Sequence, residues 1–285
     1  MTTLQDLATP ITPNFCPGCG NFGIWAAFKN AAVKAGWDNH NTVFTAGIGC
    51  HGHMVNFVKL TSFEGLHGRA IPVASGMKFA NHALNVFVFT GDGDCLGEGG
   101  NHFIHACRRN HNITILLHNN SIYGLTTGQT SPATYKGQKT KSTPDGNPDE
   151  PFLVSHLAVA AGATFVARGF TGDIAGLTDL MIAANNHQGL SVVEILQPCV
   201  TFNKECSPSF YMENTYKLPE DYDPENKALA LAKAIEWGPK QIPLGIIYRQ
   251  NRPVAESEFP QIAENTLISK EASVRDISEL FTKQH

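Results

Sequence analysis

Short apolar runs alternate with longer stretches of helical periodicity along most of the chain. This alternation is typical of βαβ units, in which helices connect the parallel strands of a sheet, so we expect an α/β fold. The expected strands are residues 42–46, 85–90, 113–118, 164–168 and 190–196. The expected helices are residues 22–34, 74–84, 98–109, 152–161 and 174–187.

Two segments interrupt this alternation. Residues 121–150 are rich in Gly, Thr, Lys and Pro and show little periodicity. A loop of this length inside a compact domain is usually functional or bound by a partner. After Cys206 the chain becomes polar, and we expect a helix, a short strand at residues 244–248 and a charged tail.

The composition narrows the range of functions. The formal net charge of −4 over 285 residues provides no basic surface, so no nucleic acid partner is expected. No apolar run approaches the roughly 20 residues of a membrane span, and the first residues lack the features of a secretory signal. Seven cysteines are an odd number for a disulfide framework, which favours a reducing, cytoplasmic setting. Only 16% of the residues are charged, which suggests that a partner covers much of the surface.

Polar residues follow two of the expected strands where each strand ends. The sequence GDGD begins at Gly91, directly after one strand, and Asn120 follows the next strand along the chain. Because parallel strands end at the same edge of a sheet, Asp92 and Asn120 are expected to lie close together. Their side-chain oxygens and the carbonyl of Ile122 suit Mg²⁺, and the glycines let the backbone approach a diphosphate. On its own, GDGD would equally fit an ordinary strand-to-helix turn.

The sequence CPGCG, with Cys16 and Cys19, allows four interpretations. It fits a zinc site, a redox dithiol, a pair of iron–sulfur ligands, or two thiols in a tight turn. A [4Fe–4S] cluster needs four thiolates, so two distant cysteines would have to complete the set. Cys50 and either Cys199 or Cys206 lie in suitable loops, and spacing alone leaves the choice between the last two open.

The GDG sequence and the Asn pair downstream resemble the motif of thiamine diphosphate enzymes, which implies Mg²⁺ bound by Asp92, Asn120 and Ile122. A closer resemblance covers residues 14–205. The phrases CPGCGNFG, GIGCHGH, LHGRA, GDGDCLGEGGNHF, YGLTTGQTSP and LQPCVTFN follow the order seen in the β subunits of 2-oxoacid:ferredoxin oxidoreductases. This resemblance implies the thiamine diphosphate-binding fold, a mostly parallel sheet with helices on both faces. It also implies a [4Fe–4S] cluster with the ligands Cys16, Cys19, Cys50 and Cys199.

The same phrases imply further residues at the site. The implied cofactor contacts are Ile48, Gly49, Cys50, His51, His67, Gly91, Gly93, Asp94, Gly124 and Leu125. His51, His53 and Thr127 are expected near the substrate, with a part in catalysis. At His53 and Thr127 the chain departs from relatives that carry lysine there, so these positions leave the choice of 2-oxoacid open.

The resemblance implies that the chain is one subunit of an enzyme. The expected reaction is coenzyme A-dependent oxidative decarboxylation of a 2-oxoacid, such as pyruvate or 2-oxoglutarate, with one-electron transfer to ferredoxin. An α subunit, in an αβ or α2β2 assembly, would supply the glutamate that activates the cofactor.

The expected domains are a thiamine diphosphate-binding domain with the cluster loops at residues 1–205 and a C-terminal extension at 206–285 that packs on the partner. Two alternatives stay open. One is a cluster-free thiamine-dependent decarboxylase or synthase, and the other is a non-catalytic electron-relay subunit.

Overall fold

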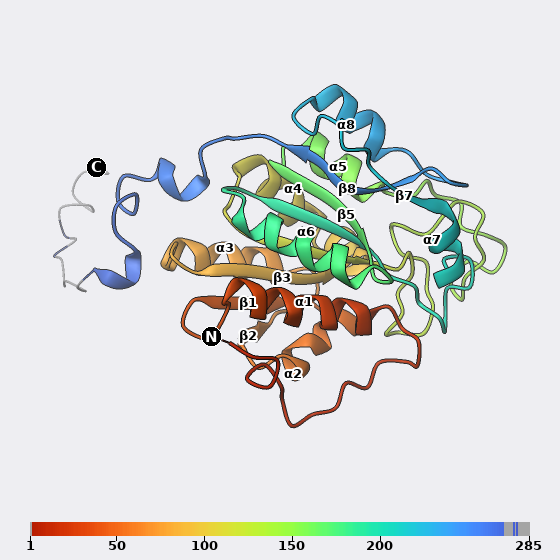
Figure 1. Cartoon of the computed structure of the whole chain (residues 1–285), viewed down its shortest axis with the longest axis horizontal. Helices are drawn as coiled ribbons and strands as arrows, with labels where there is room; N and C mark the ends of the chain where they lie inside the picture. The colour runs from red at the N-terminus through yellow and green to blue at the C-terminus, as the bar shows by residue number, and fades with distance from the viewer. Residues whose placement is uncertain (1, 271–275, 277, 279–285) are drawn as a thin grey trace.

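The apolar runs form the strands of one sheet in the computed structural model, which describes residues 2–270, 276 and 278 (Figure 1). The strand order is β2-β1-β3-β4-β6-β5-β8-β7. The strands are β1 (Thr42–Ala46), β2 (Thr61–Glu64), β3 (Asn85–Gly91), β4 (Thr114–Asn119), β5 (Phe165–Phe170), β6 (Ser191–Leu196), β7 (Thr215–Lys217) and β8 (Ile242–Arg249). The α-helices are α1 (Asn21–Ala35), α2 (Met54–Phe57), α3 (Ala70–Ala80), α4 (Gly100–Arg109), α5 (Val154–Ala161), α6 (Ile174–Asn186), α7 (Pro208–Asn214) and α8 (Lys227–Ala234).

Most of the sheet is parallel, as the alternation predicts. Strands β1 to β6 pair in parallel with their neighbours, whereas β8 pairs antiparallel with β5 and parallel with β7. Every residue of β1, β4, β5 and β6 is buried, because helices cover both faces of these strands.

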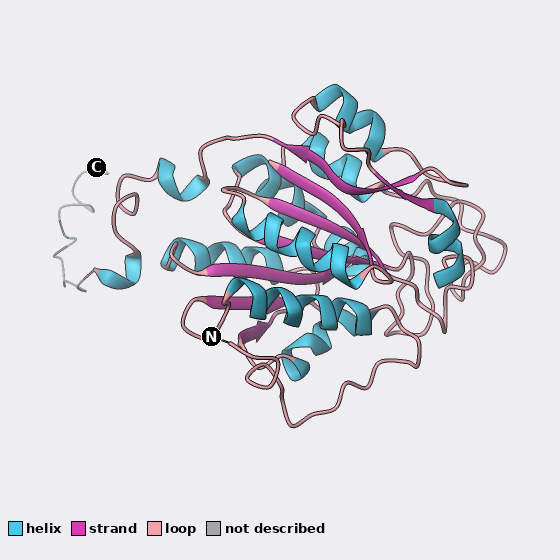
Figure 2. Ribbon diagram, viewed as in Figure 1, coloured by secondary structure: helices cyan, strands magenta, loops and turns pink. Residues whose placement is uncertain are grey.

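Helices flank both faces of the sheet (Figure 2). Each face carries its own apolar core. On one face α1 and α6 pack against the strands, and Phe28 of α1 contacts four aromatic rings. On the other face α3, α4, α5 and α8 pack against the same strands, with Phe103 of α4 fully buried. The expected α/β class with helices on both faces is therefore confirmed.

Several elements differ from the expected ones. Helix α3 begins at Ala70 rather than Ala74, because Pro72 lies in the first turn, where its missing N–H has no intrahelical partner to lose. The helix expected from Glu98 begins instead at Gly100, after a single π-helical turn at Gly93–Glu98. The short elements β2, α2, α7 and β7 were not expected.

The segment after residue 205 joins the sheet of the preceding residues. Strand β8 pairs with β5, and α8 packs beside α5. The strands on both sides of residue 205 therefore belong to one sheet. Contact between the C-terminal extension and a partner stays a prediction. Within the described residues, no helix is long and apolar enough to cross a membrane.

Candidate active site

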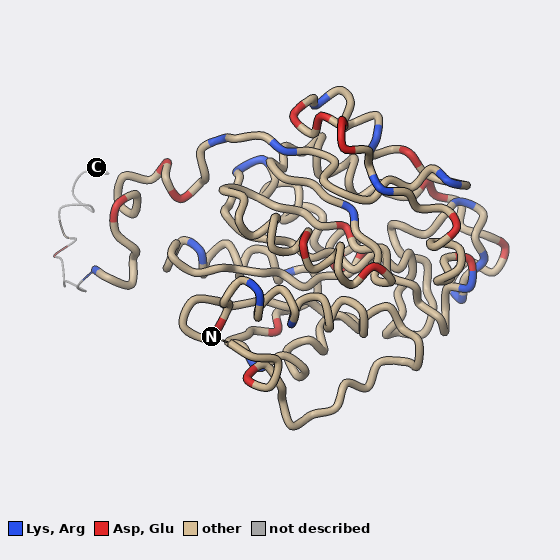
Figure 3. The backbone as a smooth tube through the Cα atoms, in the orientation of Figure 1, with Lys and Arg blue, Asp and Glu red and all other residues tan. Residues whose placement is uncertain are grey.

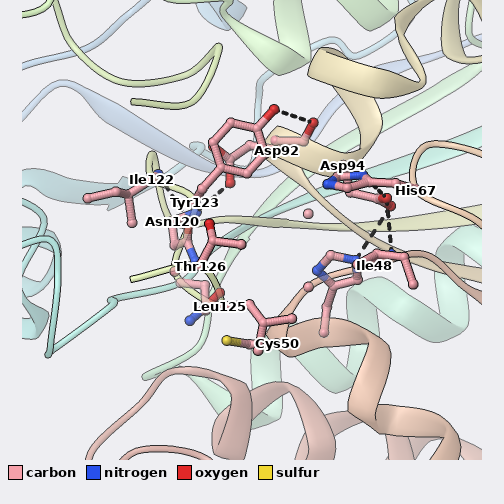
Figure 4. A pocket seen from close by; sticks show the side chains of 16 residues that line it. Ile48, Cys50, His67, Asp92, Asp94, Asn120, Ile122, Tyr123, Leu125 and Thr126 are labelled. Carbon is pink, nitrogen blue, oxygen red and sulfur yellow. Dashed lines mark hydrogen bonds and ion pairs between the residues drawn. The ribbon is translucent and has the colours of Figure 1, made fainter. Parts of the chain in front are cut away.

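The carboxyl ends of β1, β3, β4 and β6 meet at one edge of the sheet, where the following loops enclose a cavity of about 80 Å³. The pairing places Gly91 of β3 beside His118 of β4, and Asn119 of β4 beside Leu196 of β6. Every residue expected to contact the cofactor or Mg²⁺ lines this cavity (Figure 4). The lining residues are Ile48, Gly49, Cys50, His51, His67, Gly91, Asp92, Gly93, Asp94, Asn120, Ile122, Tyr123, Gly124, Leu125, Thr126 and Gln197.

Asp92 is a buried carboxylate at the start of the loop after β3. Ser131 Oγ donates to its Oδ2 at 2.5 Å, and the backbone N–H of Asn120 donates to its Oδ1 at 3.3 Å. Burial raises the pKa of Asp92 to about 6, although both hydrogen bonds favour the ionised form. A carboxylate in this position is stabilised by a cation placed beside it.

The oxygen atoms around Asp92 suit Mg²⁺. Asn120 Oδ1 accepts a hydrogen bond from the backbone N–H of Ile122 at 3.1 Å, which folds both residues into a turn beside Asp92. Among the described residues, no three His, Cys, Asp or Glu side chains are grouped around a single metal position. A diphosphate-bound Mg²⁺ does not need such a group, because phosphate, water and uncharged oxygens supply most of its ligands.

The carboxylate of Asp94 links the loops that follow β1, β2 and β3 through hydrogen bonds. It accepts hydrogen bonds from the backbone N–H of Ile48 (3.1 Å) and Gly68 (2.7 Å), and from the hydroxyl of Thr90 (2.6 Å). Burial by itself would raise the pKa of Asp94, but the contact with His51, together with these bonds, lowers it to about 2. Asp94 is therefore an anion whose oxygens are largely satisfied by the protein, and it fixes the shape of the cavity.

Two histidines each place a ring nitrogen against Asp94. His51 Nε2 lies 3.5 Å from Asp94 Oδ2, and His67 Nδ1 lies 2.9 Å from Asp94 Oδ1. Neither nitrogen makes a hydrogen bond of good geometry within the described part of the chain. Both rings therefore face the same carboxylate, in the wall of the cavity.

A second cavity, of about 220 Å³, collects four of the seven cysteines. Its lining includes Cys16, Cys19, Cys50 and Cys199, which come from the N-terminal loop, the turn after β1 and the segment after β6. Between Asp6 and Lys29 the chain carries no charged residue, and this charge-free loop is visible in Figure 3. The sequence-distant thiols therefore meet in one place of low polarity.

Cys206 does not belong to this group. Its side chain is fully buried in a separate apolar cluster with Phe170 and Tyr211, and its Sγ lies 3.6 Å from the hydroxyl of Tyr135. Of the two cysteines that spacing left open, Cys199 is the one that lines the thiol cavity.

The two cavities share a wall. Both are lined by Cys50, Asn120, Gly124, Leu125 and Gln197. A Cβ atom added to Gly124 would lie 3.5 Å from Cys199 Sγ, 3.5 Å from Asn120 Nδ2 and 3.9 Å from Cys50 Sγ. The wall is therefore one residue thick, and groups bound on its two sides would be near neighbours.

The residues expected near the substrate are distributed differently. His51 lines the first cavity and His53 lines the thiol cavity. Thr127 lines neither cavity, and its φ of 76° is strained for a β-branched residue. The ammonium of Lys141, from the long loop, donates to the Thr127 hydroxyl at 2.9 Å. That His51, His53 and Thr127 take part in catalysis stays a prediction.

Sequence reasoning missed several contributors to the site, among them Ser131, Tyr123 and Gln197. Ser131 lies in the long loop, which has no periodicity that would single out one residue. Tyr123 Oη donates to the carbonyl of Gly93 at 3.2 Å. Gln197 Nε2 donates to Cys19 Sγ at 3.4 Å. The position of Gln197 directly after β6 is the one signal that could have identified it, because ligands bind at the carboxyl ends of parallel strands.

Two family models match the chain. Residues 44–195 match the thiamine pyrophosphate enzyme C-terminal TPP-binding domain, and residues 199–264 match the C-terminal region of the pyruvate ferredoxin oxidoreductase β subunit.

Individual relatives are also similar. A 2-oxoacid:ferredoxin oxidoreductase β subunit of Aeropyrum pernix is 43% identical over 84% of this chain and 79% of its own. The 2-oxoglutarate oxidoreductase subunit KorB of Mycobacterium tuberculosis is 47% identical over 70% of this chain and 53% of its own. A solved 2-oxoglutarate:ferredoxin oxidoreductase of Magnetococcus marinus, with 2-oxoglutarate, coenzyme A and succinyl-CoA bound, superposes with a TM-score of 0.91 at 33% identity, covering 100% of this chain and 96% of that one.

Proposed function

The chain belongs to the β subunits of the 2-oxoacid:ferredoxin oxidoreductases, and from that premise we propose that it holds Mg²⁺–thiamine diphosphate and a [4Fe–4S] cluster side by side. The enzymes of this family are multi-subunit oxidoreductases. For the substrate we propose 2-oxoglutarate, with coenzyme A as co-substrate, because the Mycobacterium relative is named for that acid and the Magnetococcus structure contains both compounds.

The first cavity is proposed to bind the diphosphate end of the cofactor. Asp92, Asn120 and the carbonyl of Ile122 would hold Mg²⁺, and His67 would contact the diphosphate. No described Lys or Arg lines the cavity, so a divalent cation is the charge that would balance both Asp92 and the diphosphate. Thiamine diphosphate, when bound, supplies the carbon nucleophile and the electron sink for decarboxylation.

The second cavity is proposed to bind the cluster through Cys16, Cys19, Cys50 and Cys199. Each thiolate of a cubane binds a different iron, so the four sulfurs stand farther apart than the ligands of one ion. Burial, and to a smaller extent the neighbouring thiols, raise the pKa of Cys19 to about 11 and that of Cys50 to about 12. These thiols keep their protons until iron displaces them, and Gln197 then donates to the Cys19 sulfur.

This proposal rests on the wall that the two cavities share. An electron acceptor held by Cys50 would be separated from the cofactor cavity by one residue, because Cys50 and Gly124 line both spaces. This arrangement favours one-electron transfer from the cofactor side to the cluster side, and from there to ferredoxin. An α subunit is proposed to complete the site with the activating glutamate, and residues 206–285 are proposed to contact it.

The test is anaerobic purification of the assembled complex, with counts of iron and thiamine diphosphate per chain. Reduction of a viologen dye is then followed with 2-oxoglutarate, pyruvate and branched-chain 2-oxoacids. We expect four irons per chain, bound cofactor, and the highest rate with 2-oxoglutarate, and we expect Asp92→Ala to lose cofactor but keep iron.

Two results would point to the alternatives. Bound cofactor without iron would favour the cluster-free decarboxylase or synthase. Iron without cofactor would favour the electron-relay subunit.

A further inference from the structure

An ion pair is completely enclosed beneath the metal-binding turn. Arg168 of β5 and Glu194 of β6 are each 1% exposed, and Arg168 Nε lies 2.9 Å from Glu194 Oε2. Removing two charges from water costs about as much as their attraction returns, so such a pair is weak evidence for stability. Its contacts indicate a different role.

Glu194 extends from this pair to the end of β4. Its Oε1 accepts a hydrogen bond from Asn119 Nδ2 at 2.8 Å. Asn119 Oδ1 in turn accepts from both the backbone N–H and the hydroxyl of Ser121, each at 3.2 Å. The amide of Asn119 is therefore held in one orientation, with its nitrogen toward Glu194 and its oxygen toward Ser121.

This orientation fixes the turn that presents the metal ligands. Ser121 has a φ of 55°, in the left-handed region, and the hydrogen bonds from its N–H and hydroxyl to Asn119 hold that conformation. Residues alternate across the turn. Asn119 and Ser121 face the small cavity that contains Arg168 and Glu194, whereas Asn120 and Ile122 face the cofactor cavity.

We propose that Glu194, oriented by Arg168, is a positioning residue for the Mg²⁺–diphosphate site and acts through Asn119 on the turn that carries Asn120. This inference deepens the proposed function and rests on it. Arg168 also joins the C-terminal segment to the site, because its Nη2 donates to the carbonyl of Ala234 at 3.0 Å, at the end of α8. Its guanidinium lies 5.6 Å from the centre of the Trp237 ring.

The test measures metal affinity without turnover. The complex is loaded with thiamine diphosphate and titrated with Mn²⁺, whose electron paramagnetic resonance signal reports the free ion. In Glu194→Gln the new amide nitrogen faces the amide of Asn119, which must rotate and turn its own nitrogen toward Ser121. We expect Mn²⁺ to bind about 10–100-fold more weakly, the usual cost of losing a partner that orients a metal ligand.

Two further variants separate positioning from folding. Asn119→Asp combined with Glu194→Gln keeps the total charge and restores every hydrogen bond, so it should recover most of the Mn²⁺ affinity. Ser155→Ala removes the hydroxyl that donates to Glu194 Oε2 at 2.5 Å but leaves Asn119 untouched, so it should lower thermal stability without weakening Mn²⁺ binding. A merely structural role predicts that both measurements fall together in all variants.

Specific results would overturn the inference. Unchanged Mn²⁺ affinity in Glu194→Gln would refute it, as would failure of the double variant to recover affinity while folding normally. If Glu194→Gln does not fold, Asn119→Ala replaces it, because this change leaves the Arg168–Glu194 pair intact. Wild-type complex that binds no Mn²⁺ with thiamine diphosphate would instead refute the proposed function.

Discussion

Removal of the Ser131 hydroxyl should change the pH at which the site binds its metal. Ser131 Oγ is the closest donor to the Asp92 carboxylate, at 2.5 Å, and both side chains are buried. In Ser131→Ala the carboxylate loses this bond and keeps the longer one from the backbone N–H of Asn120, at 3.3 Å. The pKa of Asp92, which burial has already raised to about 6, should therefore rise further.

The size of this effect follows from the hydrogen bond. A bond to a charged group is worth about 1.5–3 kcal/mol, or roughly 1–2 pKa units, which brings the pKa of Asp92 to about 7–8. Mg²⁺ binds the ionised carboxylate. At about pH 7 roughly nine tenths of the wild-type carboxylate is ionised, against about a half to a tenth in the variant. The loss of Mg²⁺ affinity should thus be about 2–10-fold at pH 7, larger at about pH 6, and negligible at about pH 9.

The assay is isothermal titration of the thiamine diphosphate-loaded complex with Mg²⁺ at these three pH values. Thr130→Ala is the matched control, because the Thr130 hydroxyl bonds Thr140 and Thr143 in the same loop and does not reach Asp92. Its affinity should follow the wild type throughout. A loss in Ser131→Ala that is equal at pH 6 and pH 9 would refute the reasoning, since it would show that Ser131 acts on geometry and not on ionisation.

Three further predictions concern the wall, the thiols and the core. Gly124→Val should displace cofactor and iron together, because the new side chain would enter the space between Asn120, Cys50 and Cys199. Gly100→Ala is the control, because the added methyl group points into open space. Elemental and thiamine analysis should find both cofactor and iron retained in this control. Cys199→Ser should lose the visible absorption of the cluster and Cys206→Ala should keep it; equal loss in both would contradict the ligand assignment. Phe28→Ala should lower the free energy of unfolding by about 3–5 kcal/mol in urea titrations, and a change below 1 kcal/mol would show that the aromatic core had collapsed around the gap.

The fold and the edge of the sheet that carries the proposed metal site were predictable because their signals are local. Continuous apolar runs identified the inner strands, and the rule that parallel strands end together was enough to bring Asp92 and Asn120 to one cavity. Strand β2 was missed because its four residues lie at the sheet edge and none is buried, so no apolar pattern marks it. The antiparallel pairing of β8 with β5 could not be predicted, because an apolar run looks the same whichever way its strand is directed.

The remaining site residues depend on contacts between distant segments. Ser131 reaches Asp92 across 39 positions, and nothing in its own neighbourhood distinguishes it from the other hydroxyl residues of the loop. Cys199 and Cys206 lie close in sequence, but the chain turns between them. Only Cys199 remains at the carboxyl edge, while Cys206 enters an apolar cluster. Spacing alone contains no information about that turn.

Strand β8 also has a consequence for how the subunit is made. The ribosome releases β5, which ends at Phe170, well before β8, which begins at Ile242. Until β8 arrives, the outer edge of β5 presents unpaired N–H and C=O groups, which can pair with another chain. A translation product that stops short of Ile242 would therefore be a substrate for aggregation or proteolysis rather than a half-competent subunit. The edge of β5 is thus covered only once the chain has been made as far as β8.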